Sequence, residues 1–260
     1  MITDLPSDLK EVSGLEIVES SKRFWMLNDS GNKPRVFAVS KKGNIKKEIS
    51  VKSKNHDWED LASDEKGNLY IGDFGNNYNT RDDLRILKLD KKYLKKDKKG
   101  KVKKIHFTYE DQTEFPPKKK DRHFDAEAFI YFKDHFYIFT KSRVPGNHGL
   151  TNLYRISASE GRHVAKKIGQ YHNGTDNPSW ITSADISEDG KKLVLLSQKN
   201  VIVFTDFTGD EFFKGKKKII PFSHRSQKES IAFKDSNTVV IADEKSGKKL
   251  GLLYELSLNH

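Results

Sequence analysis

Residues 57–61 read DWEDL, and they are followed at residues 69–73 by LYIGD, an apolar run that ends in an acid. Short apolar runs bounded by turn-forming residues are typical of β-strands. The same unit recurs along the chain: a segment with the pattern polar, any, polar, any, apolar, and then an apolar strand with a polar last residue. The first segments of the five units lie at residues 11–15, 57–61, 125–129, 182–186 and 227–231. An internal repeat of this length indicates a repeat architecture.

Further strands complete each unit. Third strands are predicted at residues 36–39, 84–89, 153–156, 201–205 and 252–256, and fourth strands at residues 45–51, 102–109, 165–171 and 217–222. Four short strands in each repeat, separated by turns, are typical of a propeller blade. We therefore expect an all-β fold: a five-bladed β-propeller of four-stranded blades, formed by residues 1–260 as a single domain.

The ends of the chain together account for the last blade. The predicted blades cover about residues 11–51, 57–109, 125–171 and 181–222, and the fifth combines residues 227–260 with residues 2–5. The fifth unit has no fourth strand of its own, so we expect the N-terminal strand to complete that blade and close the ring, which removes a sheet edge. The main alternative is a propeller of six blades, one of them degenerate.

The repeat also predicts where polar side chains meet. Innermost strands of a propeller begin at one mouth of its central channel, and side chains two residues apart share one side of a strand. We therefore expect a polar ring that faces the axis, made of Ser13, Glu59, Glu127, Ser183 (or its neighbour Thr182) and Glu229. Above this ring we expect Glu11, Asp57, Asp125 and Gln227.

Three glutamates that face one narrow axis repel each other unless they are protonated, paired or bound to a cation. Oxygen ligands without imidazole or thiolate favour Ca²⁺ over zinc or copper. The predicted metal ligands are the five ring residues Ser13, Glu59, Glu127, Ser183 and Glu229. The alternative is that these acids pair with lysines or line a wet channel that holds no metal.

Long predicted loops, at residues 74–81, 110–124 and 142–149, lie on the same face of the propeller as the ring. Extra loop length on one face of a rigid scaffold is typical of a binding site. Asp29 and Asp73 are the candidate catalytic bases there. The candidate ligand-binding residues are Arg81, Lys141, Arg143, Lys245, Asn76 and Asn77. Basic groups beside a bound cation suit a phosphate, sulfate or carboxylate ligand, although each residue on its own could be a solvated strand end.

The charge is strongly positive and unevenly distributed. Lys and Arg outnumber Asp and Glu by 48 to 37, and ten lysines lie between Lys88 and Lys104. These lysines either solvate strand edges or attract an anionic substrate. No nucleic-acid-binding module accompanies the charge, so we do not expect specific nucleic-acid binding.

Two classes of protein are excluded by composition. The chain has no cysteine, which excludes disulfides and thiolate metal sites. It has no run of about 18 apolar residues, so we expect no membrane span. We expect a monomer. We also expect it to be secreted, periplasmic or at the cell surface, because millimolar extracellular Ca²⁺ fills even a weak site. Removal of an export signal would leave a start such as the one seen here.

Several motifs resemble the calcium-activated nucleotidase (apyrase) family, which implies a five-bladed propeller with one Ca²⁺ in its channel. Residues 11–15 (EVSGL) resemble the family's Glu-x-Ser-x-Leu segment, and acids or serines follow in each later unit, at Glu59, Glu127, Ser183 and Glu229. Residues 28–31 (NDSG) stand where the family has Asp-Asp-Arg-Thr-Gly, and residues 69–72 (LYIG) resemble its Leu-Tyr-Val-Gly strand. Lys141 and Arg143 loosely match its basic pair.

The chain departs from the nucleotidase pattern at the catalytic motif, because the arginine is absent and the first aspartate is Asn28. Residues 181–187 (ITSADIS) and 73–77 (DFGNN) also resemble uncharacterised bacterial propellers related to esterase-like phytases. The resemblance implies a Ca²⁺-dependent hydrolase of phosphoanhydrides or phosphoesters, with Asp29 or Asp73 as the base. The alternative is a non-enzymatic propeller that holds a structural Ca²⁺ and binds a glycan or protein ligand.

Overall fold

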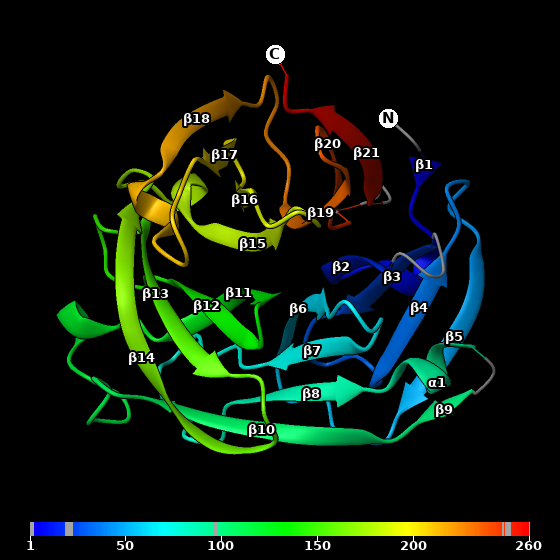
Figure 1. The fold of residues 1–260 in the computed structure, drawn as a ribbon, viewed down its shortest axis with the longest axis horizontal. Helices are drawn as coiled ribbons and strands as arrows, with labels where there is room; N and C mark the ends of the chain where they lie inside the picture. Colours follow the sequence, from blue (N-terminus) through cyan, green and yellow to red (C-terminus); the bar gives the residue numbers. More distant parts are fainter. Residues whose placement is uncertain (1–2, 19–22, 96–97, 246, 248–250, 260) are drawn as a thin grey trace.

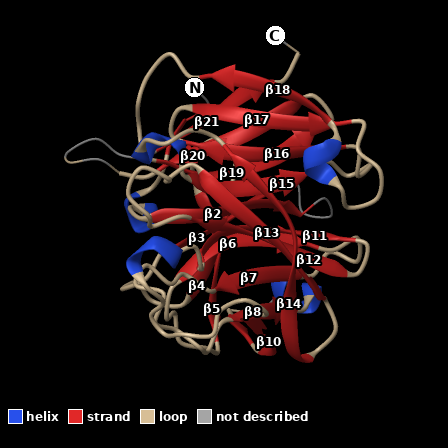
Figure 2. Cartoon of the chain, turned by 90° about the vertical axis from the view of Figure 1, so that its left-hand side faces the viewer, coloured by secondary structure: helices blue, strands red, loops and turns tan. Residues whose placement is uncertain are grey.

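Strands account for nearly all of the regular structure in the computed structural model, which describes residues 3–18, 23–95, 98–245, 247 and 251–259. They are arranged around a common centre, and the first strand, β1, lies beside the last, β21 (Figure 1). Figure 2 shows short helical turns at the ends of strands. These turns are α1 (Lys91–Lys95) and the 3-10 turns η1 (Ser7–Leu9), η3 (Lys119–Asp121), η4 (Asn177–Ser179) and η5 (Phe212–Lys214). The prediction of an all-β fold is confirmed.

Three of the four sheets are built on consecutive antiparallel strands, to which β9 adds in parallel in the first sheet and β1 adds in the last. The first consists of β2 (Val12–Val18), β3 (Arg23–Asn28), β4 (Arg35–Val39), β5 (Ile45–Val51) and β9 (Lys99–Gly100). Another consists of β15 (Ile181–Ile186), β16 (Lys192–Ser197), β17 (Asn200–Thr205) and β18 (Lys216–Pro221). The last consists of β19 (Lys228–Asp235), β20 (Thr238–Asp243), β21 (Leu252–Ser257) and β1 (Thr3–Asp4).

The remaining eight strands form one sheet, where separate four-stranded blades were predicted. Its strands are β6 (Trp58–Ser63), β7 (Leu69–Asp73), β8 (Arg85–Leu89), β10 (Val102–Tyr109), β11 (Asp125–Phe132), β12 (His135–Lys141), β13 (Leu150–Ser157) and β14 (Gly161–His172). The cause is the length of β14: its first half pairs with β10 in parallel, and its second half pairs with β13. The long strand thereby joins two antiparallel groups of four.

The N-terminal strand completes the last sheet, as predicted. Thr3 pairs with Leu253 and Asp4 with Leu252, and the amide of Leu5 donates to the carbonyl of Gly251 at 2.8 Å. The pairing covers the outer edge of β21, which would otherwise be open to pairing with another chain.

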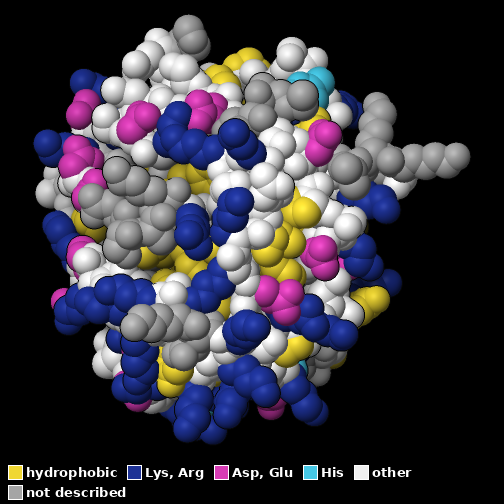
Figure 3. Space-filling view, turned by 90° about the vertical axis from the view of Figure 1, so that its right-hand side faces the viewer, with side chains coloured by type: hydrophobic (Ala, Val, Ile, Leu, Met, Phe, Trp, Pro, Cys, Tyr) yellow, Lys and Arg dark blue, Asp and Glu magenta, His cyan; other side chains and the backbone are white. Residues whose placement is uncertain are grey.

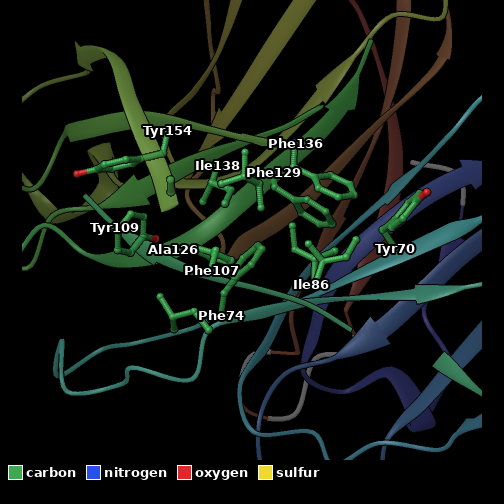
Figure 4. Close-up of a cluster of buried hydrophobic side chains, with 14 of the residues drawn as sticks. Tyr70, Phe74, Ile86, Phe107, Tyr109, Ala126, Phe129, Phe136, Ile138 and Tyr154 are labelled. Atoms are coloured by element: carbon green, nitrogen blue, oxygen red, sulfur yellow. The ribbon is translucent and has the colours of Figure 1, made fainter. Parts of the chain in front are cut away.

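The first strands of the five strand groups form a closed ring. β2 packs against β6, β6 against β11, β11 against β15, β15 against β19, and β19 against β2. The apolar core fills the spaces between neighbouring groups. Figure 4 shows one such space, where Phe74 and Phe107 pack against residues of the next group such as Phe129. The rings of Phe74 and Phe129 lie 5.3 Å apart, edge to face. This packing holds the inner strands around the axis.

Candidate functional site

Each inner strand carries a β-bulge near its first residue. The pairing with the second strand shifts between Val12 and Gly14, Trp58 and Leu61, Ala126 and Ala128, Ile181 and Ser183, and Lys228 and Ser230. A bulge leaves a residue out of the ladder and re-aims its side chain. The residues left out are Ser13, Glu59 with Asp60, Glu127, Thr182 and Glu229. The five sequence segments therefore meet at one mouth of the channel. The β-bulges that aim their side chains there were not predicted from the alternation of polar and apolar residues.

Thr182, not Ser183, takes the same register as Ser13. The hydroxyl of Ser13 donates to the carbonyl of Trp58 at 3.0 Å, and that of Thr182 donates to the carbonyl of Lys228 at 2.7 Å. Both hydroxyls thus bond to the next inner strand. Ser183 lies deeper in the channel, where its hydroxyl donates to the buried carboxylate of Asp60 at 3.2 Å.

Three acids converge at the mouth: Asp29, which follows β3, Asp57, which precedes β6, and Glu59 in β6. One carboxylate oxygen from each lies within 4.8 Å of the others. Gly75, after β7, lies directly against this cluster, and a Cβ atom there would overlap the Glu59 and Asp57 carboxylates. The acids are therefore held together by backbone from two strand groups.

Glu59 is the most unusual member of the cluster. It is only 6% exposed, and its carboxylate has no hydrogen bond or ion pair to any residue that the structure describes. Burial raises its pKa well above the usual value, and the neighbouring acids Glu127 and Asp29 raise it further. A buried carboxylate without a protein partner is costly, so it takes up a proton or a cation.

The other acids differ from Glu59 in their surroundings. Burial raises the pKa of Asp29 to about 7, and Asp57 contributes to the rise. Burial likewise raises the pKa of Glu229 to about 8, with a contribution from Glu127. Burial alone would raise the pKa of Glu127, but Lys141 and Arg143 hold it below its usual value. Lys141 also lowers the pKa of Glu229, but burial outweighs it there, so that among these four acids only Glu127 has a pKa below its usual value.

Two basic residues at the mouth, Lys141 and Arg143, are already paired with acids. The Lys141 ammonium lies 2.9 Å from the Glu127 carboxylate, and the Arg143 guanidinium lies 2.6 Å from Asp125 and 3.2 Å from Glu127. Both cations also lie about 5 Å from the ring of Trp180, at 4.9 Å and 5.0 Å. Lys141 and Arg143 thus come together beside the acids in a network of ion pairs.

Asp73 lies in a different environment from Asp29. Its carboxylate is fully buried and accepts hydrogen bonds from Arg85 at 2.8 Å, Arg81 at 3.4 Å and the amide of Asp57 at 3.2 Å. Arg81 also donates to the Gly75 carbonyl at 2.8 Å. Asp73 and Arg81 therefore support the backbone beneath the acidic cluster.

We expect Asp73→Asn to lower the free energy of unfolding by about 3 kcal/mol, because it leaves Arg85 buried without a full counter-charge. Asp83→Asn is the matched control, since Asp83 pairs with the other side of Arg81 at the surface and should cost less than about 1 kcal/mol. Urea unfolding of both variants measures the difference. Equal losses would contradict a supporting role for Asp73.

The remaining predicted residues differ in how closely they approach the cluster. Asn76 is buried, and its backbone amide donates to the Asp125 carboxylate at 2.7 Å. Asn77 is exposed. Lys245 is also exposed at the rim, where its backbone amide donates to the carbonyl of Lys10 at 3.1 Å. Of the six predicted ligand-binding residues, only Asn77 and Lys245 are exposed.

Asp57 was expected above the ring and not among the metal ligands. Its spacing of two residues from Glu59 was the available signal, because both side chains then share one side of the chain. Trp180 was missed altogether. It precedes the fourth inner strand, and no pattern in the sequence indicated that its ring would lie against Lys141 and Arg143.

No protein family and no curated protein sequence matches the chain. Solved structures do match its fold. A PQQ-bound aldose sugar dehydrogenase from Streptomyces coelicolor is 9% identical with a TM-score of 0.54, over 97% of this chain and 96% of its own. A gluconolactonase from Xanthomonas campestris is 11% identical with a TM-score of 0.53, over 95% and 86%. A chain of a nidogen–laminin complex is 11% identical with a TM-score of 0.51, over 96% and 76%.

The chain is a β-propeller. At such low identities the similarity establishes the fold alone, and it lends no specific support to the calcium-activated nucleotidase family. The matched propellers include both enzymes and a protein-binding chain, so their functions do not decide between the two kinds of role. No helix among the described residues is long and apolar enough to cross a membrane.

Proposed function

We propose that the mouth of the channel binds one Ca²⁺ ion through Asp29, Asp57 and Glu59. The observation that carries this proposal is Glu59, a buried carboxylate whose nearest charged neighbours are other acids. A divalent cation among three carboxylates would remove their repulsion and supply the missing partner. The donors are all oxygen atoms, which favours Ca²⁺ over softer metals.

The wider ring fits the same ion. Ser13, Thr182, Glu127 and Glu229 surround the cluster from the other inner strands, and water would fill positions that the three acids leave open. We take the closed ring of five inner strands as five blades in one domain. On this interpretation, β10 and β14 are the outer strands of adjacent blades that pair with each other.

We further propose that the bound ion presents a phosphate-containing small molecule for hydrolysis. Ca²⁺ would polarise the phosphoryl oxygens that bind to it. Asp29, half-buried at the rim, would accept a proton from the attacking water through the carboxylate oxygen that does not bind the ion. Lys141 and Arg143, paired with Glu127 beside the acids, would offset the negative charge that develops on the phosphate.

A second candidate is a propeller that binds a ligand without turnover and uses Ca²⁺ structurally. The pairing of Lys141 and Arg143 with Glu127 and Asp125 favours it, because neither cation is free in the protein alone. A location outside the cytoplasm fits both candidates, since Ca²⁺ is abundant there.

The test that separates the two candidates is a phosphate-release assay. Chelator-treated protein would be supplied with Ca²⁺ and with nucleoside triphosphates, nucleoside diphosphates and sugar phosphates. The hydrolase proposal predicts release that depends on Ca²⁺ and is lost in Asp29→Asn. Tight binding of Ca²⁺ with no release from any of these compounds would overturn it and favour the second candidate.

We expect the stability of the chelated protein to fall as the pH rises. Asp29 and Glu229 have pKa values of about 7 and about 8 in the folded chain, well above the value of about 4 for a carboxyl group in an unfolded chain. The folded state therefore binds protons that the unfolded state does not, and this stabilisation is lost as the pH rises through the folded pKa values.

Calcium should reverse that loss, because it binds the deprotonated carboxylates. The measurement is the midpoint of thermal unfolding with chelator and with Ca²⁺, at about pH 6, 7 and 8. We expect the difference between the two midpoints to widen with pH. A difference that is constant or that narrows would contradict the assignment of these acids to the ion.

A further inference from the structure

The excess positive charge of the chain lies in two segments, residues 41–54 and 88–104. Together they hold 16 lysines, three acids and no arginine. The rest of the chain holds 32 basic and 34 acidic side chains, so it is slightly negative although the whole chain carries +11. We call these two segments the lysine wall.

The fold brings the two segments together, although they are far apart in the sequence. β5 and β9 pair in parallel, with Ser50 opposite Lys99 and Val51 opposite Gly100. The amide of Ser50 donates to the carbonyl of Lys98 at 2.9 Å, and the Lys47 ammonium donates to the carbonyl of Leu94 at 3.0 Å. The pairing adds β9 to the outer edge of the first sheet and makes one continuous surface.

Most of these lysines are open to solvent and lack an acidic partner. Thirteen of those that the structure describes are exposed: Lys41, Lys42, Lys46, Lys52, Lys54, Lys91, Lys92, Lys95, Lys98, Lys99, Lys101, Lys103 and Lys104. Ion pairs join only Lys92 to Asp90 and Lys103 to Glu160 among them. The Glu48 carboxylate is itself neutralised by Arg35 at 2.9 Å. Figure 3 shows Lys and Arg side chains gathered over the lower part of this face, with few acids between them.

We propose that the lysine wall docks the propeller on an anionic phospholipid surface. A lysine near such a surface contributes about 1 kcal/mol, so a dozen of them are sufficient for binding at low salt. The composition fits a headgroup layer better than a nucleic acid. In nucleic-acid-binding proteins, arginine recognises bases and binds phosphates through two hydrogen bonds, and aromatic side chains stack on unpaired bases. The lysine wall has no arginine and one aromatic residue, Tyr93, which packs against the core.

Docking by this face would leave the candidate calcium site accessible. β5, β9 and α1 lie at the outer rim of the ring of strands, away from its centre (Figure 1). The mouth of the channel, formed by the inner strands, would therefore stay open to solvent. The inference is independent of the proposed function, because it uses none of the residues at the mouth.

The test is co-sedimentation of the full chain with vesicles, carried out in chelator so that Ca²⁺ cannot bridge the protein to lipid. Vesicles of phosphatidylcholine mixed with phosphatidylglycerol should bind the protein at low salt and release it at high salt, and vesicles of phosphatidylcholine alone should not bind it. A fourfold variant, Lys46→Gln, Lys52→Gln, Lys98→Gln and Lys99→Gln, should lower the partition into anionic vesicles at least about tenfold.

The matched control changes four exposed lysines outside the wall: Lys118→Gln, Lys119→Gln, Lys120→Gln and Lys191→Gln. It removes the same charge, so it separates the position of the lysines from the net charge of the chain. We expect its partition to stay within about threefold of the wild type. Equal losses in the two variants would overturn the assignment to this face. Absence of vesicle binding would overturn the proposal, and so would binding to duplex DNA without binding to vesicles.

Discussion

Calcium should raise the midpoint of thermal unfolding of the wild-type chain and leave that of Glu59→Gln nearly unchanged. An ion that binds only the folded state stabilises it by about 2.7 kcal/mol at a concentration of 100 times its Kd. For a chain of this size, that stabilisation corresponds to a rise of roughly 5–10 °C. The variant keeps the shape of Glu59 but removes one of the three carboxylates that we assign to the ion.

Without metal, in chelator, Glu59→Gln should not be less stable than the wild type. Glu59 lies among acids, and burial together with this repulsion raises its pKa well above the usual value. A neutral amide removes the repulsion, so the midpoint of Glu59→Gln without metal should equal or exceed that of the wild type. If Glu59 only contributed packing, Glu59→Gln would shift the unfolding midpoint in the same direction with and without Ca²⁺.

Glu16→Gln is the matched control for Glu59→Gln. Glu16 is also a buried acid of an inner strand, and burial and the nearby Asp185 raise its pKa. It lies in a cavity of about 450 Å³ at the other end of the inner strands, away from Asp29 and Asp57. Glu16→Gln should therefore keep the full response to Ca²⁺. A wild-type response in Glu59→Gln would contradict the assignment of Glu59 as a ligand.

Arg143→Met should lower the free energy of unfolding by about 3–5 kcal/mol, measured by urea unfolding. The guanidinium pairs with Asp125, which is fully buried, and with Glu127, which is 6% exposed. Removing it leaves Asp125 buried without its basic partner. The large expected loss follows from the unpaired carboxylate, because the intact pair itself contributes little net stability.

Two further variants isolate the cause of that loss. Arg155→Met breaks an ion pair of similar length, 2.7 Å to Asp210, between half-exposed side chains, and should cost less than about 1 kcal/mol. The double variant Asp125→Asn with Arg143→Met should recover part of the stability, because no charge is then left unpaired. Losses of equal size in Arg143→Met and Arg155→Met would show that Arg143 does not hold the acids in place.

The repeat in the sequence was sufficient to predict the strands and the pairing of the chain ends. Apolar runs such as residues 69–73 fix the strands, and the absence of a fourth strand after Leu252 required a partner from the N-terminus, which Thr3 and Asp4 supply. The eight-stranded sheet was not predicted. The extension of β14 back to Gly161 depends on a contact with β10, and no local pattern in the sequence encodes it.

The candidate site was predicted in part for a similar reason. Alternation along a strand located Glu59 and Glu127, but it could not anticipate a bulge in every inner strand. The bulge gives Thr182 the position that was assigned to Ser183. The partners of individual side chains could not be predicted, because they depend on tertiary packing. The ion pair of buried Asp73 with Arg85 is an example. Sequence patterns therefore indicated Glu59 and Glu127, whereas the convergence of Asp29 and Asp57 with Glu59 emerges only from the structure.

The most direct test of the calcium site is an anomalous difference map from metal-free crystals soaked in Ca²⁺. We predict one peak at the mouth of the channel, about 2.3–2.6 Å from carboxylate oxygens of Asp29, Asp57 and Glu59. A map without a peak among these three carboxylates, or with a peak only at the opposite end of the channel beside Glu16, would contradict the assignment of these acids as calcium ligands.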